Sequence, residues 1–187
     1  MKHKVTTPER RNQPDATGQG ELLASGLGVL WLVWSDLGLT HLALPGRPRP
    51  FAPGEGPPTG PVPARFGEPL LRYFAGENVD PARIPVDLSG TRFQVRVWQA
   101  LRCIPRGAVR TYAGVAADVG SPRAMRAVGA ANARNPIAIV VPCHRVVETG
   151  HRLGGYTGGL DRKRLLLRLE GVHVESDRVL PGQLDLL

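Results

Sequence analysis

The sequence predicts an α+β fold, with strands in the first half of the chain and helices in the second. Two apolar runs rich in β-favouring residues, Val29–Trp34 and Leu39–Leu44, are separated by a turn-forming Ser-Asp-Leu-Gly segment, which predicts an antiparallel hairpin. Later in the chain, Phe93, Val97 and Leu101 recur at helical spacing. We therefore expect a small α/β region built on an antiparallel sheet, followed by a mostly helical region.

The chain divides into four segments by composition. Residues 1–20 are polar and charged, and we expect them to form a disordered tail. Residues 21–86 would form the N-terminal α/β domain. Its segment 45–63 would be a loop, because eight of the chain's 18 prolines lie there and exclude regular structure. Residues 90–173 would form the helical domain, and residues 174–187 a C-terminal tail.

Five helices are expected from apolar spacing and from the Gly, Ser and Pro residues that flank them. Their ranges are about 68–75, 91–104, 111–118, 121–133 and 160–170. Ser121 and Pro122 suit the start of the fourth helix, because Ser caps helix N-termini and Pro is favoured at the first helical position. The third and fourth helices, joined at Val119–Ser121, match a helix-turn-helix, although many other helical domains contain such a pair.

The net charge of +8 is carried by the second half of the chain. Residues 1–90 contain nine Lys and Arg against nine Asp and Glu, whereas residues 91–187 contain 15 against seven. A basic half beside a neutral half favours a polyanionic partner, with nucleic acid as the first candidate. From charge alone, a merely soluble basic surface explains the excess about equally well.

The expected fourth helix combines small side chains with arginine. Ala127, Gly129 and Ala130 would let its backbone approach a partner closely, although tight packing against another helix is a simpler use of such residues. Arg126 adds positive charge to the same helix. For Arg123, a solvated surface position is the simpler interpretation.

The two cysteines, Cys103 and Cys143, lie far apart and form no CxxC pair. Neither a disulfide framework nor a thiolate zinc site is therefore expected, and no metal ligands are predicted. Cys103 lies in an apolar helical stretch and is expected to be a small buried residue.

Cys143 is a candidate nucleophile because His144 follows it. The thiolate is the reactive form of cysteine, and a histidine can take the thiol proton. Adjacent side chains do not usually face each other, so a bridging water would have to carry that proton. A histidine base also needs an orienting group, and Glu170 is one candidate. From the residues alone, an exposed carboxylate is the simpler interpretation of Glu170.

Several motifs resemble those of methylated-DNA–protein-cysteine methyltransferases, also called alkylguanine-DNA alkyltransferases. The motifs are Gly-Thr-Arg-Phe-Gln at 90–94, Arg-Ala-Val-Gly at 126–129, Asn-Pro at 135–136, Pro-Cys-His-Arg-Val-Val at 142–147 and Gly-Tyr-Thr-Gly-Gly-Leu at 155–160. The resemblance covers residues 90–172 closely and residues 21–80 loosely. It implies a ribonuclease-H-like N-terminal domain, a winged-helix-like second domain and no cofactor.

The resemblance implies that Cys143 accepts an alkyl group from O6-alkylguanine in DNA, with O4-alkylthymine as a further candidate substrate. The resulting thioether has no ready route back to a thiol, so one protein molecule would repair one lesion. His144 would deprotonate Cys143 through a water, and Glu170 would orient His144. Asn135 would hold the active-site segment against the helix-turn-helix.

The resemblance also implies how DNA is bound. Tyr112 would contact the extruded base and the phosphate beside it, and Arg126 would fill the gap left in the stack after base flipping. Four residues would line or approach the base pocket: Val146 through its backbone carbonyl, Tyr156, Thr157 and Lys163. The helix surface facing the minor groove would include Ala127, Gly129 and Ala130.

The expected partner is double-stranded DNA containing alkylated guanine, bound by a monomer. No membrane contact is expected, because no apolar run approaches the length of a span. The first 20 residues lack the apolar core of a secretory signal, which favours the cytoplasm, near the nucleoid in a bacterium, or the nucleus in a eukaryote.

Two other functions stay open at this point. The first is a non-enzymatic sensor of alkylated guanine, although sensors of that kind lack the acceptor cysteine that Cys143 would supply. The second is a transcription regulator whose alkylation changes promoter binding, for which no additional DNA-binding domain is visible in the sequence.

Overall fold

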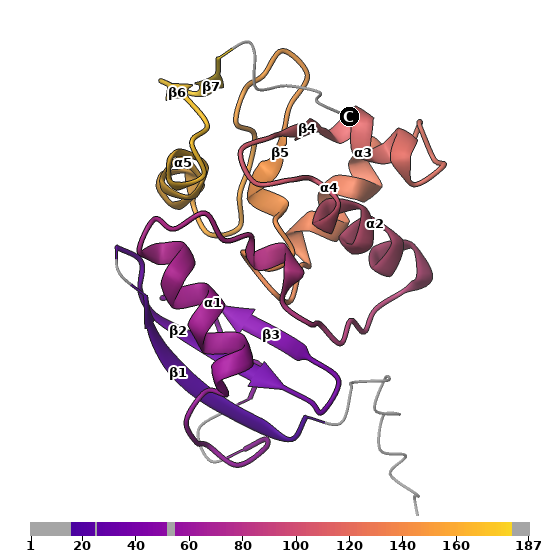
Figure 1. Ribbon diagram of the computed structural model, residues 1–187. Coiled ribbons are helices and arrows are strands. Elements are labelled where there is room, and N and C mark those ends of the chain that lie inside the picture. Colours follow the sequence, from indigo (N-terminus) through magenta and orange to yellow (C-terminus); the bar gives the residue numbers. More distant parts are fainter. Residues whose placement is uncertain (1–15, 25, 52–54, 181–187) are drawn as a thin grey trace, which may run out of the picture.

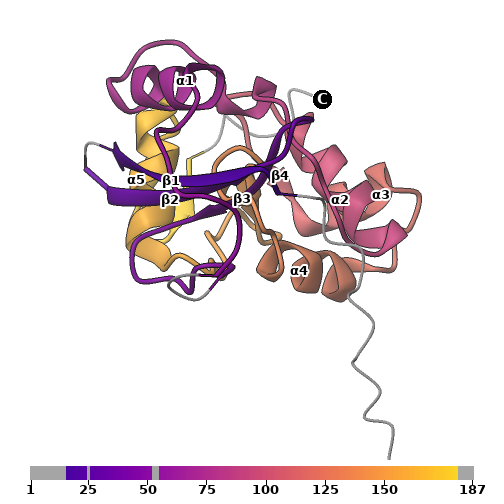
Figure 2. The same cartoon turned by 90° about the horizontal axis from the view of Figure 1, so that it is seen from below.

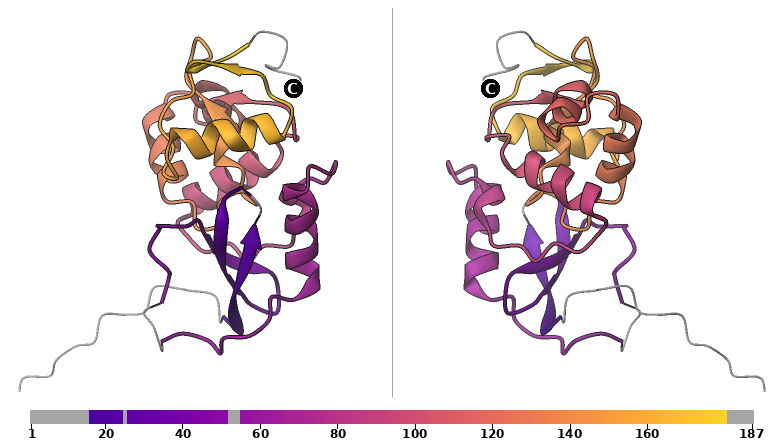
Figure 3. Two further views of the ribbon diagram at one scale, coloured as in Figure 1. Left: turned by 90° about the vertical axis from the view of Figure 1, so that its left-hand side faces the viewer. Right: turned by 90° about the vertical axis from the view of Figure 1, so that its right-hand side faces the viewer.

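The computed structural model describes residues 16–24, 26–51 and 55–180 (Figure 1). Its first half contains β1 (Gly18–Ala24), β2 (Gly28–Trp34), β3 (Leu39–Ala43) and α1 (Ala64–Phe74). The second half contains α2 (Arg92–Arg102), β4 (Arg110–Thr111), α3 (Tyr112–Asp118), α4 (Met125–Ala133), β5 (Val146–Val147), α5 (Leu160–Leu169), β6 (Val174–Glu175) and β7 (Arg178–Val179). Figures 1 and 3 show the sheet and α1 at one end of the molecule and α2 to α5 at the other.

The fold is mixed α/β, as the sequence predicts. The three-stranded sheet has the antiparallel order β1-β2-β3, which includes the expected hairpin. Among the described residues, no helix is both long enough and apolar enough to cross a bilayer.

Helix α1 covers one face of the sheet. Leu30, Leu32 and Trp34 alternate along β2 and are buried on the face that α1 covers, and Val33 on the other face is buried as well. The ring of Phe66 on α1 lies 6.3 Å from the ring of Trp34. Helix α1 begins at Ala64 rather than near residue 68, because Phe66 and Leu70 share one buried helical face and extend the helix back to Pro63.

The first strand, β1, was not predicted, and its start at Gly18 lies inside the segment expected to be a tail. Its glycines have low strand propensity, so the sequence does not predict a strand here. The packing leaves no room for a side chain at either glycine. A Cβ on Gly18 would lie 2.5 Å from the Trp34 ring, and a Cβ on Gly20 would lie 2.3 Å from the carbonyl oxygen of Gly60. Residues 1–15 of the predicted tail lie outside the described residues.

The described part of the proline-rich segment forms no helix or named strand, in agreement with the predicted loop. It is tied to β1 by Gln19, whose side-chain amide donates to the carbonyl oxygens of Glu55 at 3.2 Å and Pro57 at 2.8 Å. The loop therefore follows the edge strand rather than extending into solvent.

The helical half is organised around α2 and α4. A capping box between Thr91 and Gln94 starts α2, which buries Val97, Trp98 and Leu101. The indole nitrogen of Trp98 donates to the carbonyl oxygen of Ala131 at 3.0 Å, joining α2 to α4. Cys103 is exposed rather than buried, because it caps the end of α2 away from that apolar stripe.

The helix-turn-helix is present, but α4 begins at Met125 and not at Ser121. The amide of Ser121 closes the end of α3 by donating to Ala116 O at 2.8 Å, and Ala124 N donates to Ser121 O at 2.8 Å. Residues 121–124 therefore form a tight turn, and Ser121 does not act as the N-cap. Figure 2 shows α4 at the surface, on the opposite side of the molecule from α1.

The expected C-terminal tail also contains structure. Strands β6 and β7 pair as an antiparallel hairpin. Val174 and Val179 are buried in a second apolar cluster with Val147, Leu153 and other residues of the helical half. The packed part of that half therefore extends beyond residue 173.

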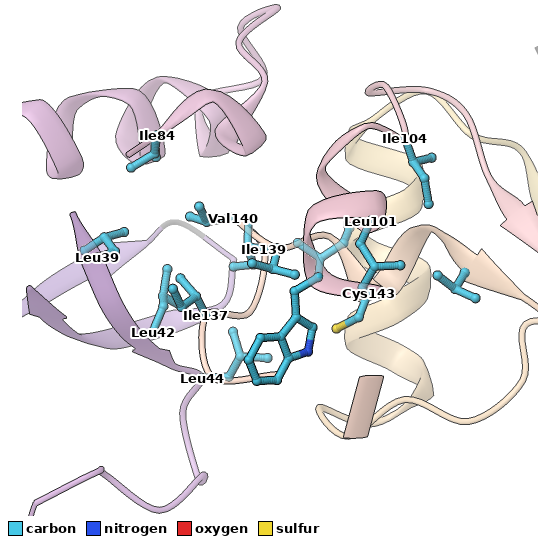
Figure 4. Close-up of a cluster of buried hydrophobic side chains, with 14 of the residues drawn as sticks. Leu39, Leu42, Leu44, Ile84, Leu101, Ile104, Ile137, Ile139, Val140 and Cys143 are labelled. Carbon is cyan, nitrogen blue, oxygen red and sulfur yellow. The ribbon is translucent and has the colours of Figure 1, made fainter. Parts of the chain in front are cut away.

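The main apolar cluster runs from the sheet into the helical half (Figure 4). Leu39 and Leu42 of β3 lie near Ile137 and Ile139 of the loop that leads to Cys143. The amide of Leu42 donates to Pro136 O at 2.9 Å, so the edge of the sheet is paired with that loop. The sheet thereby helps to fix the segment that carries Cys143.

We predict that Leu32→Ala lowers the free energy of unfolding by about 2–5 kcal/mol, because it leaves a cavity in a fully buried part of the core. Leu37→Ala is the matched control, because Leu37 is 76% exposed and its truncation should change stability by less than about 0.5 kcal/mol. Urea unfolding followed by circular dichroism measures both values. Equal losses in the two variants would contradict the packing described here.

Candidate active site

Cys143 lies at the start of a short 3-10 helix, Cys143–Arg145, directly after Pro142. Cys143 is 7% exposed and lies at the edge of the main apolar cluster (Figure 4). Ile139, four residues earlier, has a φ of 73°, an unfavourable value for a β-branched residue. Strained backbone of this kind persists where the surrounding packing enforces it, and it is frequent beside functional sites.

Asn135 holds the Cys143 segment in place. Its side-chain nitrogen donates to Val141 O at 2.7 Å and to the Cys143 Sγ at 3.1 Å. Its side-chain oxygen accepts from the amide of Ile137 at 3.0 Å. One side chain just after α4 therefore fixes both the loop backbone and the thiol.

Burial raises the pKa of the Cys143 thiol, because a thiolate is poorly solvated in an apolar site. The hydrogen bond from Asn135 and the nearby cation of Lys163 act in the opposite direction. A thiol in this setting needs a proton acceptor before it can act as a nucleophile.

His144 is fully buried, and its Nε2 lies 3.0 Å from Oε1 of Glu170. Burial acts to raise the pKa of Glu170, but the neighbouring His144 and Arg145 outweigh it and hold this pKa well below its ordinary value. Glu170 is therefore a carboxylate and can only accept, so the proton of a neutral His144 must lie on Nε2.

This arrangement leaves Nδ1 of His144 as the free basic nitrogen. Burial lowers the pKa of His144, and Glu170 only partly opposes that effect, so the ring is neutral at neutral pH. Within the described residues, Nδ1 has no hydrogen-bond partner. His144 can therefore accept a proton there.

Besides His144, Glu170 is held by donors from its neighbour Arg145 and from Tyr73. Arg145 donates through Nε to Oε2 at 2.9 Å and through Nη2 to Oε1 at 2.9 Å. The hydroxyl of Tyr73, 97 residues away on α1, donates to Oε1 at 2.9 Å. Arg145 is also bound by Asp80 at 2.9 Å and by Ile104 O at 2.6 Å, so its buried charge is fully paired.

Cys143 opens into two cavities of about 240 and 250 Å³. The residues lining both cavities are Asn132, Cys143, Tyr156 and Thr157. The second cavity is also lined by Tyr112 and Gly129 of the helix-turn-helix. The first extends toward the sheet and the proline-rich loop, with Leu42 and Arg47 in its wall.

The helix-turn-helix presents an exposed surface beside the second cavity. On α4, Arg126, Ala127 and Ala130 are exposed, whereas Val128 is buried in the core. Gly129 faces Tyr112, since a Cβ at that position would lie 3.9 Å from the tyrosine ring. The Tyr112 hydroxyl lies 3.5 Å from the carbonyl oxygen of Gly155.

Two of the predicted pocket residues lie behind the cavities rather than in their walls. Lys163 is fully buried, and its ammonium group donates to Val146 O at 2.6 Å and to Leu153 O. Burial lowers the pKa of Lys163 to about 8. In this structure the Val146 carbonyl, expected to receive guanine, accepts from Lys163.

Comparison with known proteins identifies the family. Residues 92–172 match the family model described as 6-O-methylguanine DNA methyltransferase, DNA binding domain. The methylated-DNA–protein-cysteine methyltransferase of Mycolicibacterium paratuberculosis is 47% identical over 161 residues, which cover 80% of this chain and 90% of that protein. The chain belongs to the methylated-DNA–protein-cysteine methyltransferase family. A relative of the same name from Methanosarcina barkeri is 42% identical over 153 residues and is covered to 95%.

Solved structures of methyltransferases have the same fold. The Mycobacterium tuberculosis OGT in complex with DNA gives a TM-score of 0.72 at 41% identity, covering 82% of this chain and 92% of that chain. The O6-methylguanine-DNA methyltransferase of Pyrococcus kodakaraensis gives a TM-score of 0.60 at 26% identity, covering 82% and 99%. The mixed α/β arrangement described above is therefore that of the methyltransferase family.

The predicted residues fall into four groups in space. Cys143, Tyr112, Gly129, Tyr156 and Thr157 line the second cavity. Asn135 is hydrogen-bonded to Cys143, and His144, the next residue, is paired with Glu170. Arg126, Ala127 and Ala130 lie on the exposed surface of α4, and Val146 and Lys163 lie behind the cavities. Sequence reasoning missed three residues of the site: Tyr73, Arg145 and Asn132. A signal existed for Arg145, because a lone charge inside an apolar run indicates a buried, paired group.

We predict that Glu170→Gln lowers the free energy of unfolding by about 3 kcal/mol, because it removes the buried charge that pairs with Arg145. Glu175→Gln on the exposed side of β6 is the matched control and should have little effect. Urea unfolding at pH 7 measures both. A Glu170→Gln variant as stable as the control would contradict the paired network.

The stabilising effect of Glu170 should also depend on pH in a defined direction. The folded-state pKa of Glu170 lies below the unfolded value of about 4.3. The stabilisation is therefore fully present above that unfolded value and is lost as the pH falls through the folded one. The stability difference between wild type and Glu170→Gln should be constant from pH 8 to 5 and should shrink below pH 4.

Proposed function

We propose that this protein repairs DNA by transferring an alkyl group from the O6 atom of alkylguanine to Sγ of Cys143. The observation that carries the proposal is the position of a buried thiol in the wall of a cavity that opens beside the helix-turn-helix. A neutral His144, held through Nε2 by Glu170, stands behind it as a proton acceptor. Family membership supports the same reaction, since relatives are named for it.

The proposed reaction is a single displacement. The thiol proton passes to Nδ1 of His144 through a water, and the sulfur attacks the alkyl carbon bound to O6. A carbon–sulfur bond forms, the carbon–O6 bond breaks, and its electron pair stays on the guanine. The guanine then takes up the proton that left Cys143. Cys143 ends as an alkyl thioether, so each protein molecule acts once. The reaction requires no cofactor.

We infer that the damaged nucleotide is flipped out of the duplex into the second cavity, because O6 inside a base stack is out of reach of a buried thiol. Tyr112 and Tyr156, with Thr157, line this cavity and suit contacts with a base. Arg126 is exposed on α4 close to the cavity and would occupy the gap left in the stack. The small exposed residues Ala127 and Ala130 suit a close approach to the minor groove.

Finer features of the fold fit the same proposal. We infer a ribonuclease-H-like N-terminal region, supported by its antiparallel strands followed by α1. We also infer a winged-helix-like second region, supported by α2 to α4 together with the short strands β4 and β5. Lys163 would support the pocket from behind by holding the Val146 backbone.

Mass spectrometry of the intact protein tests the reaction. After incubation with a duplex bearing one O6-methylguanine, wild type should gain one methyl group per chain, mapped to the peptide that contains Cys143. Cys143→Ala should gain nothing. Cys103→Ala is the matched control, and it should react like wild type because Cys103 is the exposed cysteine away from the cavity. Lesion-selective binding without any mass gain would instead indicate a sensor.

Arg126→Ala should separate base flipping from alkyl transfer. We predict that it slows repair of the duplex by about tenfold or more, because nothing then fills the gap in the stack. Transfer from free O6-benzylguanine should change little, because a free base needs no flipping. Arg123→Ala, an exposed arginine in the turn before α4, is the matched control. Equal losses of rate on both substrates would contradict the flipping role.

A further inference from the structure

Asn132 lies where the two cavities meet and has no role in the reaction described so far. It is on the last turn of α4, one turn after the buried Val128, and is only 7% exposed. It lines the second cavity together with Tyr112 and Gly129, and it also lines the cavity that extends toward the sheet. Cys143 shares both walls with it.

The amide of Asn132 is polar, buried and largely unpaired within the protein. Among the described residues, neither Nδ2 nor Oδ1 has a hydrogen-bond partner of good geometry. A buried donor or acceptor without a partner carries a desolvation penalty, so such groups are rare in folded proteins and call for an explanation. Asn135, one turn further on, differs in this respect because both ends of its amide are bonded within the active-site loop.

The surroundings indicate what the amide is directed at. Burial raises the pKa of the Tyr112 hydroxyl, and a side-chain hydrogen-bond interaction with Asn132 opposes that rise, so the amide lies beside this hydroxyl. The hydroxyl of Tyr156 in the same wall is likewise buried and unbonded among the described residues. Two side chains with unpaired polar groups, Asn132 and Tyr156, thus meet in one cavity beside the nucleophile, as in ligand sites.

We propose that Asn132 recognises the flipped base by donating one hydrogen bond through Nδ2 and accepting one through Oδ1. The inference rests on the proposed function and assigns one further specificity-determining residue to it. A carboxamide matches a neighbouring acceptor and donor on a base. O6-alkylguanine presents such a pair, because alkylation removes the proton from N1 and leaves it as an acceptor beside the N2 amine.

The same pairing would separate the lesion from its product. Ordinary guanine carries a proton on N1, so its N1 and N2 are both donors, and the amide of Asn132 can satisfy only one of them. A site that leaves a buried polar group unpaired rejects the wrong ligand strongly. Asn132 would therefore favour binding of alkylguanine and release of the repaired base.

The test compares two alkylations of Cys143 in the full-length protein. One is methyl transfer from a duplex bearing O6-methylguanine, and the other is displacement of iodide from iodoacetamide by the Cys143 thiolate. Asn132→Leu keeps the size of the side chain but removes both hydrogen bonds. It should slow methyl transfer by about tenfold, the loss expected for one or two hydrogen bonds, and leave the iodoacetamide rate within twofold.

Val128→Ala is the matched control, because it loosens the same helix without changing either cavity wall. It should lower the melting temperature but keep the ratio of the two rates. Asn132→Ala gives the same test if the leucine variant folds poorly. Equal slowing of both reactions would show that Asn132 acts on the thiol, and an unchanged methyl-transfer rate would show that it has no role. Either result overturns the proposal.

A second substrate tests the hydrogen-bond pattern. O6-methylhypoxanthine lacks the N2 amine but keeps the acceptor at N1. Wild type should transfer methyl from it more slowly than from O6-methylguanine, and Asn132→Leu should show a smaller preference between the two. An undiminished preference in Asn132→Leu would overturn the assigned contact. If wild type accepts methyl from neither substrate, the proposed function itself is wrong. That result differs from the one that would overturn only the role of Asn132.

Discussion

The buried carboxylate of Glu170 is the interaction on which the rest of the site depends. It accepts hydrogen bonds from His144 and Arg145, which are neighbours in one 3-10 helix, and from Tyr73 on α1. A carboxylate without those donors would be costly in this interior, and Arg145 without the carboxylate would be equally costly. The network therefore forms as a whole, and it sets which nitrogen of His144 is left free to act on Cys143.

The network also explains why the sheet and the helical half are packed together. Tyr73 belongs to α1, which covers the sheet, yet its hydroxyl donates a hydrogen bond to Glu170 in the helical half. The edge strand β3 is paired with the loop before Cys143 through Leu42 and Pro136. The first half of the chain thus holds the Cys143 segment from two sides, while the face of α4 that we propose as the DNA-binding surface stays exposed. The family model that matches residues 92–172, in the helical half, is described as a DNA binding domain.

Much of this could be predicted from the sequence, and the failures have physical causes. The hairpin, the paired helices and the Pro-Cys-His-Arg segment depend on local patterns and could be recognised. Strand β1 could not be recognised, because Gly18 and Gly20 have low strand propensity and are explained by close packing against Trp34 and Gly60. Tyr73 could not be predicted to join the site, since an apolar helical face gives no sign that its hydroxyl meets a residue 97 positions away. The unused amide of Asn132 becomes visible only when both cavity walls are seen together.

The measurement that tests the central claim most directly is nitrogen NMR of the His144 ring across pH 5–8. If Glu170 is a carboxylate that accepts from Nε2, the spectrum at pH 7 should show a neutral ring with its proton on Nε2 and a bare Nδ1. A ring that is positively charged at pH 7, or a neutral ring with its proton on Nδ1, would contradict the account. In either case His144 could not receive the proton of Cys143 in the way described.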